Sequence, residues 1–197
     1  MTMVDRCAIR LAVAGVLLML AVASQGCGGW SGPRLTAGNP NPSMGGFPAV
    51  SPAHHALQGE MFLCLTGPGQ AVITEVRPIN PTGTIEVVGY AVRPNPVLRG
   101  AQMLGAEYGA LRTHGFTRNR TVDTRCGGPN SGQGYELGLE LAVPPGMNAG
   151  TTAWEIDYTV GGHAASLTFP LGAVLCSTSN MDDGPCKHVW QKYGVNW

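Results

Sequence analysis

The stretch that decides the fold is residues 154–169, WEIDYTVGGHAASLTF. From Trp154 to Val160 apolar side chains alternate with polar ones, which is the pattern of a β-strand with one buried face. Two glycines follow Val160, and a glycine pair favours the tight hairpin turns whose residues need positive φ. A two-residue turn sets Trp154 opposite Phe169 and brings apolar residues together on one face. The sequence therefore predicts an antiparallel, half-buried hairpin.

Further apolar runs, separated by turn residues, predict more strands. Within 135–143, apolar residues alternate with glutamate, glycine and alanine, which indicates a second half-buried strand. Within 83–93, apolar residues occupy both faces, which favours a central place in a sheet. Shorter strands are expected at 62–65, 71–77, 121–126 and 172–176. We predict an all-β fold, an antiparallel immunoglobulin-like β-sandwich of about seven or eight strands stapled by disulfides. A jelly roll and a small barrel are the alternatives.

Composition agrees with this fold class. The chain has 197 residues, of which 29 are glycine and 15 are proline, and only 12% are charged. Many glycines and prolines favour short strands joined by turns over long helices. The length predicts one domain with attached segments. The formal net charge is zero, which disfavours a nucleic-acid partner.

The N-terminal residues have the pattern of an export signal. Arg6 and Arg10 precede the apolar run 11–22, which is shorter than the roughly 20 residues needed to span a bilayer. Cleavage after the A-x-A motif at 21–23 would release a secreted protein. Cleavage before Cys27 would instead leave that cysteine as a lipid-bearing first residue.

A resemblance favours the second route. The signal sequence with Gly26-Cys27, the Gly/Pro-rich stretch after it, and the alanine- and glycine-rich composition resemble actinobacterial-type exported lipoproteins. The resemblance implies lipidation of Cys27 and anchoring to the membrane outside the cytoplasm, and it implies no catalytic residues. We therefore expect a signal peptide at 1–26, an unordered tether at 27–58, and a β-sandwich domain with an aromatic tail at 59–197.

Cysteine parity is consistent with this interpretation. If Cys27 carries lipid, four cysteines remain after the signal, an even number for an oxidising compartment. We favour the pairs Cys64–Cys126 and Cys176–Cys186, with Cys64–Cys176 and Cys126–Cys186 as the alternative. No C-x-x-C motif is present, so thiol redox chemistry is disfavoured.

Positive charge gathers in one part of the sequence. Six arginines but only two acidic residues lie between Arg93 and Arg125. Much of this part is the connection 94–118, which lacks clear periodicity, and connections of such length are often functional. The predicted binding surface consists of Arg99, Arg112, His114, Arg118 and Arg120. It would suit an anionic envelope polymer, a lipid headgroup or an envelope protein, although charges at strand edges also prevent aggregation.

Carboxylates offer a hydrolase as an alternative. Glu136 and Glu140 share one strand face, as do Glu155 and Asp157, and two such pairs could act as acid and base. The simpler interpretation is that they are solvent-facing positions of amphipathic strands.

Histidine and methionine offer a metal-binding alternative. His54, His55, Met44 and Met61 are ligand types that suit copper, but no ligand spacing recurs. Asp182 and Asp183 match no calcium-loop pattern. We predict no metal site and no cofactor.

An aromatic stripe ends the chain. Trp190, Tyr193 and Trp197 recur at helical spacing and are expected to pack against the sandwich rather than to stack on a sugar. Taken together, the sequence predicts a non-enzymatic, lipid-anchored binding module of the cell envelope with an unidentified ligand. A periplasmic copper-binding protein and a secreted hydrolase are the alternatives.

Overall fold

The computed structural model describes residues 30–38, 43–127, 134–182 and 184–193. The chain divides after Ser31, and the elements below belong to the unit that begins at Gly32. The predictions for Cys27, Asp183 and Trp197 lie outside the described residues.

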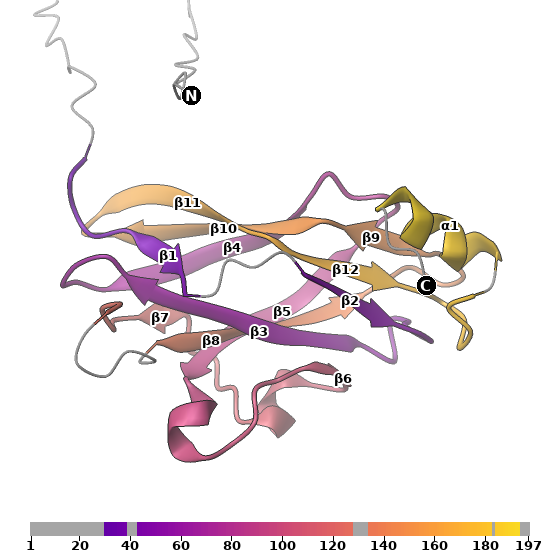
Figure 1. Ribbon diagram of the computed structural model, residues 1–197, viewed down its shortest axis with the longest axis horizontal. Coiled ribbons are helices and arrows are strands. Elements are labelled where there is room, and N and C mark those ends of the chain that lie inside the picture. The colour runs from indigo at the N-terminus through magenta and orange to yellow at the C-terminus, as the bar shows by residue number, and fades with distance from the viewer. Residues whose placement is uncertain (1–29, 39–42, 128–133, 183, 194–197) are drawn as a thin grey trace, which may run out of the picture. The chain divides into compact units, whose positions relative to one another are not determined.

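The structure is mostly β, and its strands form three sheets (Figure 1). The first has the order β1 (Leu35–Ala37), β3 (Ala56–Leu65), β8 (Tyr135–Ala142) and β5 (Glu86–Pro94), with β6 (Ala106–Tyr108) also paired to β3. The second has the order β11 (His163–Phe169), β10 (Ala153–Val160), β4 (Ala71–Ile79) and β7 (Thr121–Val122). The third has the order β2 (Ser43–Phe47), β12 (Leu171–Leu175) and β9 (Ala149–Thr151). Neighbouring strands are antiparallel except β2 and β12.

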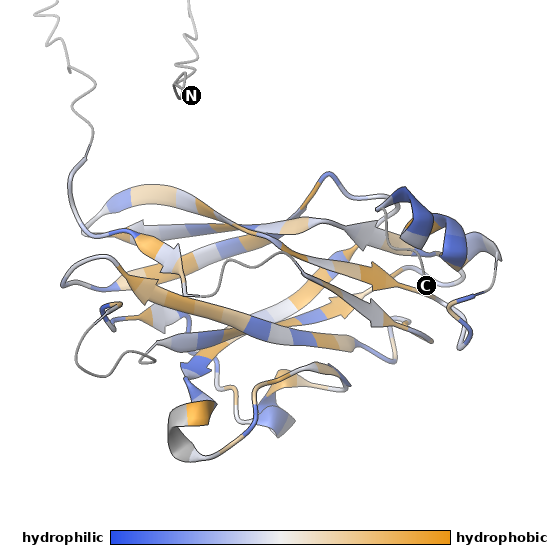
Figure 2. Ribbon diagram, viewed as in Figure 1, coloured by the Kyte–Doolittle hydropathy of each residue, from blue (hydrophilic) through white to orange (hydrophobic). Residues whose placement is uncertain are grey.

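The first two sheets form the layers of a β-sandwich-like fold, with β10, β11 and β4 in one layer and β3, β8 and β5 in the other (Figure 1). Side chains from the two layers meet in the interior, where Trp154 of β10 donates a 2.9 Å hydrogen bond to Gln58 of β3. Both residues are buried. Figure 2 shows hydrophobic and hydrophilic residues alternating along several strands, as expected when one face of each strand is buried.

The predicted hairpin is confirmed residue by residue. β10 and β11 pair in the predicted register, from Val160 opposite His163 to Trp154 opposite Phe169. The turn residues Gly161 and Gly162 have φ values of 56° and 80°, the left-handed conformation that glycine adopts without strain.

Two predictions about the strands are not met. The described residues contain twelve strands, several of only two or three residues, so the count of about seven or eight is not confirmed. β5 was expected to be central, but it is the last strand of its sheet, and Val88 is 49% exposed. Apolar residues on both faces of β5 led to the prediction of a central strand. One of these faces is instead covered by a loop rather than by a further layer of the fold.

The predicted tether is also corrected. Its described residues from Gly32 onward are part of the folded unit. β1 pairs with β3, β2 pairs with β12, and Phe47 and Val50 are buried. β1 and β2 are short and pair with strands that come later in the sequence, so they need few apolar residues of their own. Composition alone therefore did not indicate them.

Both favoured disulfides, Cys64–Cys126 and Cys176–Cys186, are present. Disulfides persist in oxidising compartments, so these two indicate an extracytoplasmic environment. Among the described residues, no helix is long and apolar enough to cross a membrane.

The aromatic tail packs against the fold, as predicted for its described residues. The helix α1 (Gly184–Lys192) buries Trp190 beside the Cys176–Cys186 disulfide. The Tyr193 hydroxyl donates to the Gly150 carbonyl at 2.6 Å and accepts from the Thr82 amide at 3.0 Å.

Residues 95–120, here called the excursion, cover the outer face of the first sheet. They contain two short 3-10 helices, η1 (Pro96–Arg99) and η2 (Leu111–His114), with β6 between them. Gln58 points into the sandwich, so its neighbour Leu57 points to the outer face, because side chains alternate along a strand. There Leu57 joins a second small core, completed by Ala91, Leu104, Leu111 and Phe116.

Candidate functional site

A buried ion pair attaches the excursion to the sheet. Glu136 of β8 is fully buried, and its Oε2 lies 2.7 Å from Nε and from Nη2 of Arg93 on β5. Its Oε1 accepts from the backbone amides of Leu104 at 2.7 Å and Glu60 at 3.3 Å. Four donors therefore satisfy this carboxylate.

Arg93 extends the same network into the excursion. Its guanidinium donates to the carbonyl oxygens of His114 and, at 3.1 Å, Gln102, and it lies 4.5 Å from the centre of the Phe116 ring. Glu136 was expected to face solvent, and that expectation is wrong because the excursion covers its face of the sheet. The pair is structural, since all its polar atoms are directed at protein partners.

Glu140 lies four residues after Glu136 on the same face of β8, and it binds His55. Its Oε1 lies 2.6 Å from Nδ1 of His55, and its Oε2 accepts from the Leu111 amide at 3.3 Å. Nε2 of His55 lies 2.8 Å from the Pro52 carbonyl oxygen. Glu140 is thus fixed between the residue before β3 and the first residue of η2.

The other carboxylate pair lies on the second sheet. Arg77 of β4 binds Glu155 at 3.1 Å, Asp157 at 2.5 Å and Glu75 at 2.9 Å. Desolvation lowers the pKa of Arg77, but the hydrogen bonds and charges of Asp157 and Glu155 outweigh it and raise that pKa above its ordinary value. All four carboxylates considered for hydrolysis are therefore engaged by basic partners, and the geometry gives the hydrolase alternative no support.

A groove of about 730 Å³ runs between β5 and the excursion. We call it the basic groove, and it is lined by Val88, Gly89, Tyr90, Ala91, Leu111, Arg112, Phe116, Thr117, Arg118, Arg120 and Glu140. Its volume lies within the range of sites that hold small ligands.

Three arginines give the basic groove its charge. Arg112 lies on η2, while Arg118 and Arg120 lie on the strip that returns to β7, and all three are exposed. Hydrogen bonds from Ile73 to the Arg120 carbonyl and from Val92 to the Asn119 carbonyl hold this strip. The Arg120 guanidinium lies 4.3 Å from the centre of the Tyr90 ring. Among the residues that line the groove, Glu140 is the single carboxylate, and His55 engages it.

The structure thus brings together part of the predicted binding surface. Arg112, Arg118 and Arg120 line one groove, while His114 gives its backbone carbonyl to Arg93. Arg99 ends η1, and its side chain is outside the described set. The sequence did not indicate that Tyr90 and Glu140 line the same groove, although their places on two neighbouring strands are the signal that could have found them.

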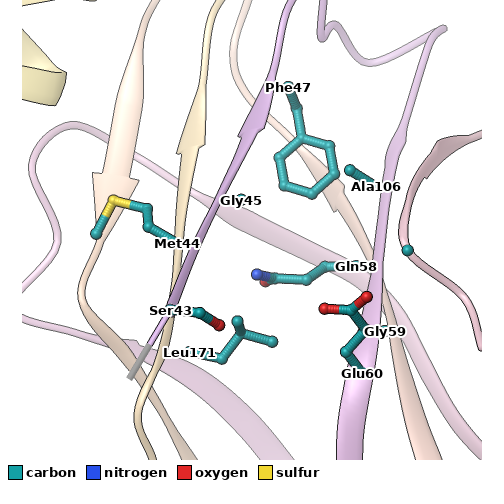
Figure 3. Close-up of a pocket in the computed structure, with 10 residues that line it drawn as sticks. Ser43, Met44, Gly45, Phe47, Gln58, Gly59, Glu60, Ala106 and Leu171 are labelled. Atoms are coloured by element: carbon teal, nitrogen blue, oxygen red, sulfur yellow. The ribbon is translucent and has the colours of Figure 1, made fainter. Parts of the chain in front are cut away.

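A second, smaller pocket lies between β2 and β3 (Figure 3). Its volume is about 120 Å³, the space of about four water molecules. Figure 3 shows the Gln58 amide and the Glu60 carboxylate beside each other on β3, with the Phe47 ring at one end. Glu60 lies in a β-bulge of β3, and its φ is 63°. This conformation turns the backbone amide of Glu60 toward the Glu136 carboxylate.

The residues named for copper do not converge. Met61 is buried in the core, the ring of His54 lies 4.6 Å from that of Tyr108, and both ring nitrogens of His55 face oxygen atoms. Burial raises the pKa of Tyr108. Within the described part of the chain, no three His, Cys, Asp or Glu side chains lie close enough to hold a metal ion.

Comparison of the sequence with models of protein families and with curated proteins gave no match.

Proposed function

We propose that the chain is a non-enzymatic, extracytoplasmic binding module of the cell envelope whose basic groove holds an anionic ligand. The observation that carries this proposal is the convergence of Arg112, Arg118 and Arg120 on one groove. Arginine is the side chain best suited to hold phosphate or carboxylate groups, because its planar fork donates two parallel hydrogen bonds. The whole chain has zero formal net charge, so the attraction is local to the groove.

The ligand class that fits best is a phosphodiester, either in an envelope polymer or in a lipid headgroup. Three arginines provide more positive charge than a single anionic group needs, which favours a ligand that repeats its phosphodiesters, as an envelope polymer or a membrane surface does. The exposed positions of the arginine side chains leave their donors accessible. Val88, which is 49% exposed, adds an apolar surface against which the non-ionic part of such a ligand can pack.

Attachment to the membrane belongs to the same proposal. A lipid on Cys27 would keep the groove close to the envelope polymers and headgroups that we propose as ligands. The two disulfides are consistent with this location. An immunoglobulin-like arrangement of the sandwich is also proposed, supported by two antiparallel layers that share one interior.

The test compares two variants that lose the same charge. Replacement of Arg112, Arg118 and Arg120 by glutamine should weaken binding of poly(glycerol phosphate), measured by titration calorimetry, roughly tenfold or more. Replacement of Arg125, Lys187 and Lys192 by glutamine, all exposed and outside the groove, should leave the affinity within about a factor of two. Equal losses in both variants would mean that net charge rather than the groove attracts the polymer.

Vesicles separate the two sources of phosphodiester. If the ligand is a lipid headgroup, phosphatidylglycerol vesicles should bind the wild-type protein and release it when the three groove arginines are replaced. If it is a polymer, poly(glycerol phosphate) should bind with the same dependence on the arginines while vesicles do not. Binding of neither probe would overturn the proposed function.

A further inference from the structure

Both ring nitrogens of His55 face oxygen atoms that accept hydrogen bonds. Nδ1 lies 2.6 Å from Oε1 of Glu140, and Nε2 lies 2.8 Å from the carbonyl oxygen of Pro52. A neutral imidazole carries only one N–H group, and a carbonyl oxygen can only accept. A neutral His55 beside an ionised Glu140 would therefore set a lone pair against an oxygen at one of the two contacts. Both contacts are hydrogen bonds only if the pair holds one more proton, on His55 or on Glu140.

The extra proton decides the charge at one wall of the basic groove. With the proton present, the His55–Glu140 pair is neutral, and the three groove arginines are not opposed by a carboxylate of the lining. Without it the pair carries one negative charge beside Leu111, whose amide binds Glu140 and whose neighbour is Arg112. That charge would attract the arginines and repel an anion.

Among the described residues, no charged group other than Glu140 forms an ion pair with His55. From β6, Tyr108 packs against His54, and burial raises its pKa, so the phenol stays neutral. Glu107 of β6 lies opposite Leu57 in the sheet register. From η2, His114 directs its carbonyl to Arg93. Glu140 is the charged group that contacts the imidazole.

We propose that the basic groove binds its anion together with a proton, which His55 and Glu140 hold between them. This inference rests on the proposed function of the groove. Because the anion favours the protonated pair, the affinity of the groove for the anion falls as pH rises. By linkage, the bound anion must in turn increase the proton affinity of the pair.

The first test uses poly(glycerol phosphate), whose phosphodiesters stay ionised throughout the range measured. Its affinity for the wild-type protein should fall roughly fivefold or more between about pH 5.5 and about pH 8. At an intermediate pH, calorimetry in buffers of different ionisation enthalpy should show that the protein takes up protons when the polymer binds. Replacement of the exposed His188 of α1 by glutamine should change neither result.

Two substitutions have opposite expected effects. Glu140→Gln removes the charge but keeps an amide that can bind His55 and Leu111, so the affinity at high pH should rise to the wild-type value at low pH. His55→Gln leaves the carboxylate uncompensated, so binding should be weak at every pH. A purely structural role would shift both variants in the same direction.

The outcomes distinguish the two proposals. Binding that is intact but independent of pH, or equal shifts from both substitutions, overturns the coupled proton and leaves the groove as the binding site. Absence of binding at every pH overturns the groove and the proton together.

Discussion

Arg93 is the side chain through which the excursion is attached to the first sheet. It pairs with a fully buried carboxylate and also reaches two carbonyl oxygens and an aromatic ring of the excursion. Breaking a buried ion pair leaves an uncompensated charge in the interior, which costs more than the pair itself contributes.

Replacement of Arg93 by leucine should therefore lower the free energy of unfolding by roughly 3–5 kcal/mol. Arg77→Leu is the matched control, because Arg77 also binds carboxylates but is 43% exposed. Exposed pairs contribute little, so the control should cost far less than Arg93→Leu. Urea denaturation measures the loss of unfolding free energy in both variants. Similar losses would show that the buried Glu136 carboxylate does not need Arg93 to compensate its charge.

At this scale the sequence predicted part of the site. The shared strand face of Glu136 and Glu140 was evident from their spacing, as was the arginine cluster. The burial of Glu136 was not, because the residues that cover it lie in a segment without periodicity. Contacts between such a segment and a sheet depend on its path in space, which no local pattern encodes.

At the scale of elements, Gly138 sets how closely η2 approaches β8. A Cβ at this position would lie 2.7 Å from a Leu111 side-chain carbon and 2.8 Å from Phe116. Both residues line the basic groove, so the position of the groove wall depends on the missing side chain.

Gly138→Ala should displace η2 and destabilise the protein by roughly 1–3 kcal/mol, as overpacking does elsewhere. It should also weaken binding of poly(glycerol phosphate), because Leu111 and the neighbouring Arg112 would move. Gly105→Ala is the control, since a Cβ there meets no atom within 4 Å. Unfolding and calorimetric titrations of both variants check this account, and an unchanged Gly138→Ala protein would contradict it.

Strand prediction was most precise where apolar and polar residues alternate, and it missed the short strands near the N-terminus. The β10–β11 hairpin has both alternation and a diagnostic turn, so even its register was predictable. β1 and β2 have three and five residues, too few to establish a period. β5 is apolar on both faces because the excursion covers one of them. In sequence this pattern is the same as that of a central strand buried between two layers.

At the scale of the whole molecule, the two disulfides constrain loops of very different length. Cys64–Cys126 spans 62 residues and encloses the entire excursion, whereas Cys176–Cys186 spans 10. In the loop-entropy model, a longer closed loop removes more freedom from the unfolded chain.

Replacing both cysteines of Cys64–Cys126 by serine should lower stability by about 4 kcal/mol, against about 3 kcal/mol for Cys176–Cys186. Thermal unfolding of the two double variants under the same conditions measures the order. A larger loss from the shorter loop would indicate that packing of α1 and Trp190 against its disulfide outweighs chain entropy.

The central claim is that the anion is held by Arg112, Arg118 and Arg120. Arginine side-chain NMR during titration with poly(glycerol phosphate) tests it most directly. The Nε–H resonances of these three residues should shift together and saturate, while that of Arg77 on the second sheet stays in place. Shifts spread over all exposed basic side chains, or none at all, would contradict the account.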